Sequence, residues 1–82
     1  MEIYPNPTTG PIIVAFNVGK QTNAKLCVLD LNGKSYMTIA QDEFPAGNYK
    51  YSADLGELAE GLYVVTLTTE NGNITSKVIK QK

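Results

Sequence analysis

The chain has 82 residues, a length typical of a single domain. Hydrophobic residues make up 43% and charged residues 18%, which argues against intrinsic disorder. The formal net charge is −1, so the chain as a whole is not expected to bind nucleic acid through its charge. A domain of this size buries only about 60–65% of its unfolded surface, so we expect a thin core.

The residue types present exclude most catalytic chemistry. There is no histidine and Cys27 is the single cysteine, which excludes a Ser–His–Asp triad, a Cys–His pair and an ordinary zinc site. We therefore expect no enzyme, no cofactor, no metal and no internal disulfide. The sequence has no run of about 18 apolar residues, so no membrane span is predicted. The N-terminus also lacks the pattern of a signal peptide. We expect Met1-Glu2 to be the start of a domain excised from a longer chain.

The first half of the chain alternates between turn formers and short apolar runs. Residues 1–10 are rich in proline and glycine and are predicted to be a lead-in that is extended or turning. Residues 12–16 and 24–31 are predicted strands, because β-formers alternate there. In the second of these, Cys27 is placed on the face opposite Leu26 and Val28, where partial exposure is expected.

Turn signals divide the next part of the chain. Asn32-Gly33 predicts a tight hairpin, because both residue types tolerate positive φ. The returning strand is predicted over residues 34–40, a turn over 42–47 and a further strand over 48–53.

Residues 54–60 are the one segment with helical character. Asp54 followed by Glu57 resembles a capping box, and we expect about one helical turn whose apolar side chains face inward; these are Leu55, Leu58 and Ala59. Gly61 ends this segment.

Two strands complete the chain, over residues 62–69 and 73–80, joined by a turn at Asn71-Gly72. The total is six to seven short strands at regular spacing. This pattern predicts an all-β fold, an immunoglobulin-like antiparallel β-sandwich over residues 11–82. The Cys…Trp…Cys signature of immunoglobulin domains is absent, so the likeness concerns architecture alone.

Several motifs, in order along the chain, resemble a known family. They are the opening Pro5-Asn6-Pro7-Thr8-Thr9-Gly10, the strand end Val28-Leu29-Asp30-Leu31-Asn32-Gly33, the segments Gly47-Asn48-Tyr49 and Asp54-Leu55, the strand Gly61-Leu62-Tyr63, and the closing Lys77-Val78-Ile79-Lys80. Together they are similar to the C-terminal domain that directs proteins through the type IX secretion system, the Por system of Bacteroidetes. Thr8-Thr9 departs from the family pattern, which more commonly has one small residue.

The resemblance implies a sorting role. The domain would direct a covalently fused upstream cargo protein from the periplasm, through the outer-membrane translocon, to the cell surface or the extracellular space. A cysteine sortase would then remove it. The translocon or another partner would recognise the closing strand, with Lys77 and Lys80 as the best candidates for direct contact beside Val78 and Ile79. The opening motif, Pro5, Asn6, Pro7 and Gly10, is the second candidate. Asp30, Gly33, Gly61 and Tyr63 would be structural.

Alternative interpretations exist for the same residues. Turn chemistry alone would explain the opening motif as a rigid lead-in to the first strand. Lysines on a terminal strand also discourage aggregation between sheet edges, although such an edge can equally bind a partner strand. Exposed terminal strands also allow a strand-exchanged homodimer. Finally, the fold class and five tyrosines allow a different function, an accessory module that binds carbohydrate or protein.

Overall fold

The computed structural model describes residues 1–82, which form seven β-strands and no helix. The strands are β1 (Glu2–Tyr4), β2 (Pro11–Val18), β3 (Thr22–Leu29), β4 (Ser35–Phe44), β5 (Gly47–Asp54), β6 (Gly61–Thr69) and β7 (Gly72–Lys80). No helix of the length and apolarity needed to cross a bilayer is therefore found. The predicted all-β class and strand number are confirmed.

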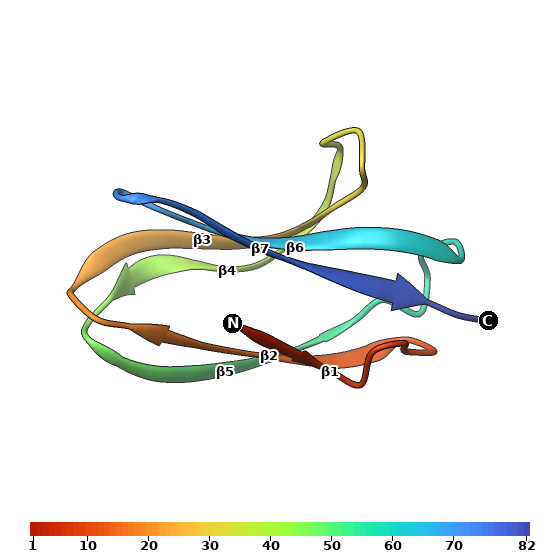
Figure 1. Ribbon diagram of the computed structural model, residues 1–82, viewed down its shortest axis with the longest axis horizontal. Coiled ribbons are helices and arrows are strands. Elements are labelled where there is room, and N and C mark those ends of the chain that lie inside the picture. The colour runs from red at the N-terminus through yellow and green to blue at the C-terminus, as the bar shows by residue number, and fades with distance from the viewer.

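The strands form two stacked antiparallel sheets (Figure 1). One sheet has the order β1-β2-β5 and the other the order β4-β3-β6-β7. The chain crosses between the layers after β2, after β4 and after β5, so both sheets mix early and late strands. The predicted β-sandwich is confirmed, with β4 paired to β3 in the larger sheet.

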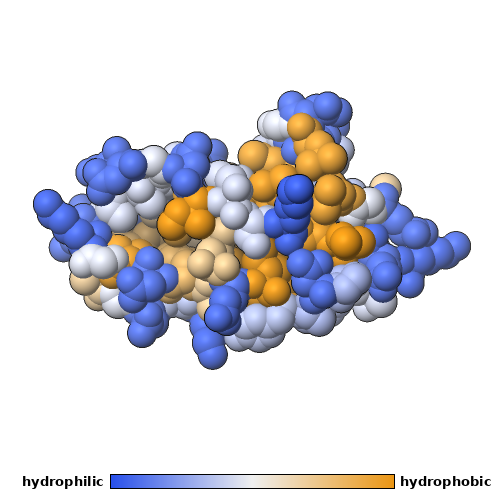
Figure 2. Space-filling view, in the orientation of Figure 1, coloured by the Kyte–Doolittle hydropathy of each residue, from blue (hydrophilic) through white to orange (hydrophobic).

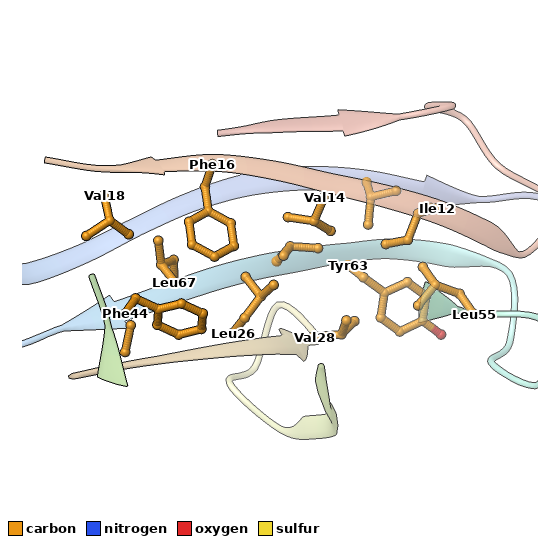
Figure 3. Packing of buried hydrophobic residues seen from close by; sticks show 13 residues of the cluster. Ile12, Val14, Phe16, Val18, Leu26, Val28, Phe44, Leu55, Tyr63 and Leu67 are labelled. Atoms are coloured by element: carbon orange, nitrogen blue, oxygen red, sulfur yellow. The ribbon is translucent and has the colours of Figure 1, made fainter. Parts of the chain in front are cut away.

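Alternation of side chains places the core between the sheets. In β2, the even-numbered residues from Ile12 to Val18 are buried, and in β3 the same is true of Ala24, Leu26 and Val28. The core cluster has 13 buried residues drawn from both sheets (Figure 3). Burying one such aliphatic side chain contributes about 1.5–3 kcal/mol, so this cluster is the main source of stability.

Aromatic side chains fill one end of the core. The Phe16 ring lies edge-on to Phe44, with centroids 5.7 Å apart, and is stacked with Tyr49 and Tyr51 at 5.5 and 6.0 Å. Phe44 also meets Tyr49 edge-on at 4.9 Å. This packing explains why β4 continues to Phe44, although residues 42–47 were predicted to be a turn. Phe44 pairs with Thr22 and is buried, so the turn is reduced to the two residues before Gly47.

The predicted helical turn over residues 54–60 is wrong. Asp54 is the last residue of β5, and its Oδ1 accepts a hydrogen bond from the N–H of Gly56 (2.8 Å), which makes a turn and not a capping box. The N–H of Leu58 donates to the carbonyl of Leu55 (2.9 Å), and no further helical bond follows. Gly56 also opposes helix formation through its backbone entropy. Leu55 is buried as expected, whereas Ala59 is exposed.

Cys27 is buried, with 7% of its surface exposed, although alternation had indicated partial exposure. Its Sγ lies 3.7 Å from Oγ1 of Thr38 on the neighbouring strand β4. A register shift between Leu26 and Cys27 interrupts the β3–β4 ladder at this position. The thiol therefore lies on the outer side of the larger sheet, against the neighbouring Thr38 side chain.

Candidate functional site

The two predicted recognition motifs lie against each other, although they are at opposite ends of the sequence. The side chain of Asn6 donates from Nδ2 to the carbonyl of Lys77 (2.9 Å) and accepts at Oδ1 from the N–H of Ile79 (3.0 Å). These bonds span 71 and 73 residues of sequence. We call residues 5–10 the entrance segment. Through Asn6 it holds the outer edge of β7.

The backbone at Thr8 extends this contact. The N–H of Thr8 donates to the carbonyl of Ile79 (2.9 Å), and the N–H of Gln81 donates to the carbonyl of Thr8 (2.7 Å). Thr8 thereby forms a parallel bridge with Lys80. The end of β7 is paired on both sides, with β6 and with the entrance segment.

Thr8 was not among the predicted site residues, yet only 2% of its surface is exposed. Its hydroxyl donates to the carbonyl of Pro11 (2.7 Å) and accepts from the N–H of Gly10 (3.0 Å). A threonine two residues before a glycine is a turn signal that could have identified this role. The hydroxyl fixes the bend between the bridge to β7 and the start of β2.

The remaining residues of the opening motif shape the entrance segment. Pro5 and Pro7 are exposed, and the peptide bonds that precede both are cis. Because proline has no N–H, Asn6 and Thr8 supply every hydrogen bond from this segment to β7. Gly10 lies against the turn after β5: a Cβ at Gly10 would be 2.9 Å from Oδ1 of Asp54 and 3.2 Å from the Gly56 Cα.

The side chains of the closing motif divide between two faces. Lys77 and Ile79 point outward and are exposed, Ile79 by 45%. Val78 is fully buried in the core. Lys80 has only 7% of its surface exposed, and its Nζ donates to the carbonyl of Gln81 (3.0 Å). Of the two lysines predicted to make direct contact, Lys77 is accessible and Lys80 is packed.

The outward side chains of β7 belong to a larger apolar surface. Lys77 is paired with Val64 and Ile79 with Leu62, and Val64 is paired in turn with Leu29 of β3. We call these five residues the terminal face. Figure 2 shows hydrophobic surface gathered between the end of β7 and the raised hairpin between β3 and β4. The terminal face carries one cation, Lys77, on an otherwise apolar row.

The predicted structural motif at Asp30 organises the β3–β4 turn. Oδ1 of Asp30 accepts hydrogen bonds from the N–H groups of Asn32 (2.8 Å) and Lys34 (2.9 Å). Gly33 has φ of 86°, a conformation that favours glycine. Because Asp30 captures these donors, the loop is longer than the predicted tight hairpin, and the strands end at Leu29 and resume at Ser35.

These hydrogen bonds also change the acidity of Asp30. The N–H of Lys34, followed by smaller contributions from the N–H of Asn32 and the hydroxyl of Tyr36, lowers the pKa of the Asp30 carboxyl below its ordinary 3.8, against an opposing effect of desolvation. The Tyr36 hydroxyl lies 3.3 Å from Oδ2. The turn is therefore held by an ionised carboxylate.

Gly61 and Tyr63 begin strand β6 and close the same end of the sandwich. Tyr63 is buried in the core, and its hydroxyl donates to the carbonyl of Ala59 (2.6 Å). Its ring lies edge-on to Tyr36, with centroids 5.7 Å apart. Gly61 is paired with Lys80, so β6 supports the segment of β7 that the entrance segment holds from the other side.

Comparison with known proteins gives one match. The model of a family described as "Secretion system C-terminal sorting domain" matches residues 2–81, nearly the whole chain. No curated protein and no solved structure match it. The matched range begins at β1 and includes both the entrance segment and β7.

Proposed function

This chain belongs to the family of secretion system C-terminal sorting domains, and we propose that the type IX machinery recognises it at the end of β7. The domain is a C-terminal sorting signal for type IX secretion, which implies an attached cargo, contact with the secretion machinery and delivery across the outer membrane to the surface or beyond.

In this proposal the terminal face touches the translocon. Lys77 and Ile79 make the side-chain contacts, because they are the outward residues of the closing motif. Val78 and Lys80 act from the inner side by fixing the strand, and Pro5, Asn6, Pro7 and Gly10 hold it through the entrance segment. Within the predicted lead-in of residues 1–10, β1 is itself a strand of the smaller sheet, and the entrance segment that follows it fastens the end of β7.

One observation carries this proposal: the two family motifs at the ends of the chain form a single hydrogen-bonded unit. A strand end whose backbone is held on both sides offers a partner a surface that costs little backbone entropy to bind. The cargo would pass through the periplasm while attached upstream of Met1, and a cysteine sortase would cut the chain upstream of the domain.

Secretion of a reporter fused to the domain tests this proposal. In a type IX host, Lys77→Glu reverses the charge on the terminal face and is expected to leave the reporter in the periplasm. Lys25→Glu is the matched control. Lys25 is exposed on the same side of the larger sheet, but it lies far along the strands from the terminal face. Equal export of the two variants would show that the terminal face is not read.

The five tyrosines give no support to a carbohydrate-binding module. Tyr49 and Tyr51 stack with Phe16, and Tyr63 is buried. Tyr4 and Tyr36 are the more exposed rings, and Tyr36 packs edge-on against Tyr63. These rings are used mainly for internal packing.

A further inference from the structure

One side of the sandwich is closed along only part of its length. Toward the end of β7, strand β1 pairs with β2, and Thr8 bridges to Lys80, so the two sheets are joined there. In the other direction β2 continues to Val18, past the point where β1 begins, and no strand pairs with that side of β2 there. Figure 1 shows the N-terminus lying midway along this side, at the boundary between the closed and the open parts.

The open part begins with an unpaired sheet edge. All eight residues of β2 pair with β5, but only Ile13, Val14 and Ala15 pair with β1. Residues 16–18 therefore have a strand on one side alone, and such an edge is a template for pairing with another strand.

Ile74 of β7 marks the opposite wall of the open part. It pairs with Leu67, a core residue, and by alternation it shares the inner face with Val78. Val78 is fully buried, whereas 48% of Ile74 is exposed. Leu67 lies beneath Phe16 and Val18 (Figure 3), so Ile74 is an inward-facing apolar side chain at a level where no strand covers it.

A groove of ≈ 660 Å³ beside the N-terminus crosses the face of this sheet, since its lining comes from residues 1–2, residues 15–17 of β2 and residues 48–50 of β5, and it does not follow the free edge of β2. Met1 and Ile3 both pack against the core, so the alternation of β1 already includes Met1. If β1 is extended backward along β2, the first residue before Met1 would lie opposite Asn17 and face outward. The second would lie opposite Val18 and face inward, toward Ile74.

We propose that the polypeptide entering the domain at Met1 continues β1 along residues 16–18, with an apolar side chain at the second position before Met1 covering Ile74. This inference rests on the proposed function in one respect, because the attached cargo supplies the entering segment. Continuity with the β1–β2 ladder favours this occupant over a free strand. A tethered segment also has a high effective concentration at the edge.

NMR on the 82-residue chain with a short N-terminal extension tests the proposal. One extension ends Ser-Val-Thr, with valine at the second position before Met1, and the matched control ends Ser-Asp-Thr. With valine, we expect exchange of edge-facing amides within residues 16–18 to slow about tenfold or more. We also expect nuclear Overhauser effects between the valine methyls and those of Ile74. The aspartate extension should show neither effect, and Ile74→Ser should weaken the protection given by valine.

Two results would overturn the proposal. In the first, the valine extension keeps random-coil shifts and the exchange of residues 16–18 is unchanged. In the second, these amides become protected in the unextended chain as its concentration rises, with a dimer seen by sedimentation, which would assign the edge to a second copy. Neither measurement involves secretion. If the extension is ordered but the domain fails to export cargo, the proposed recognition is refuted and the present inference stands. If the domain exports cargo but the extension stays disordered, the present inference is refuted and the proposed recognition stands.

Discussion

Asn6 substitutes for strand pairing that its neighbours cannot provide. A side-chain amide has the same donor and acceptor as a peptide group, and here both are used, toward the carbonyl of Lys77 and the N–H of Ile79. The prolines on either side have no N–H of their own. One residue therefore gives the entrance segment the pairing that two backbone groups of a regular strand would make.

Replacing Asn6 by alanine removes both bonds, and we expect the free energy of unfolding to fall by about 1–2 kcal/mol. Urea denaturation measures this change. The exchange of the Ile79 amide should also rise, because its acceptor is lost. Asn17→Ala is the control, since it removes an exposed side-chain hydrogen bond to Asn48 that is remote from β7. An unchanged Ile79 amide would contradict the assigned role.

Asp30 gives the domain a pH dependence of known sign. Its pKa is lowered in the folded state, chiefly by the N–H of Lys34, so the folded protein binds this proton more weakly than the unfolded chain. The stabilisation is therefore complete above the ordinary value of 3.8 and is lost as the pH falls through the lower folded pKa.

We expect the melting temperature to fall on acidification below pH 3.8 more steeply in the wild type than in Asp30→Asn. Asparagine keeps the side-chain oxygen that accepts from Asn32 and Lys34 but has no proton to gain. Thermal melts over a pH series measure the difference. Parallel curves for the two proteins would show that the Asp30 carboxylate does not contribute.

At the level of elements, β7 is both a core strand and the proposed recognition strand. It pairs with β6 along nine residues, and Val78 is fully buried. Deleting the end of the strand would therefore test folding before it could test recognition, and point substitutions on the outward face are the better probe.

Deletion of residues 77–82 is expected to abolish the cooperative fold, because it removes Val78 from the core and the contacts of Asn6 and Thr8. Circular dichroism and NMR dispersion would report this loss. Removal of Lys82 alone, which is exposed, and Lys77→Glu should both leave the fold intact. If the longer deletion still melts cooperatively, β7 is not integral to the sandwich.

The strands were predictable wherever alternation spans several residues, as in β2, β3 and β6. Strand β1 was not, because three residues before a proline carry too little pattern. The extension of β4 to Phe44 depends on aromatic packing across the sandwich, which local turn chemistry does not record. Both candidate recognition motifs could be found from the family resemblance. Their contact could not, because no local signal connects Asn6 to a strand more than 70 residues away.

The different burial of Lys80 and Lys77 also could not be predicted from the local sequence. Alternation puts the two lysines on opposite faces of β7, but a lysine on the inner face of a terminal strand is usually expected to reach solvent. The bridge from Thr8 covers this position, so Lys80 is packed. Covering by a distant segment is a tertiary effect that the strand's own sequence does not encode.

Across the whole molecule, stability depends on one small core that both sheets share. Leu26→Ala creates a cavity at a fully buried site and is expected to cost about 2–5 kcal/mol. This is a large fraction of the stability of about 5–15 kcal/mol that is usual for a domain. Leu31→Ala is the matched control, because Leu31 is 63% exposed, and it should cost less than about 0.5 kcal/mol. Urea titration of both variants makes the comparison, and equal midpoints would contradict it.

The parallel bridge between Thr8 and Lys80 has a mechanical consequence. When the two ends of the chain are pulled apart, neighbouring parallel segments slide past each other, so their hydrogen bonds resist together and do not open one at a time. Two backbone bonds and the two bonds of Asn6 lie across this junction. The domain is thus built as a shear clamp between whatever is attached before Met1 and whatever holds β7. Traction on the cargo would enter through β1 and load its pairing with β2 together with this clamp, so the rate of forced unfolding would depend on Asn6 and Thr8 as well as on the β1–β2 ladder.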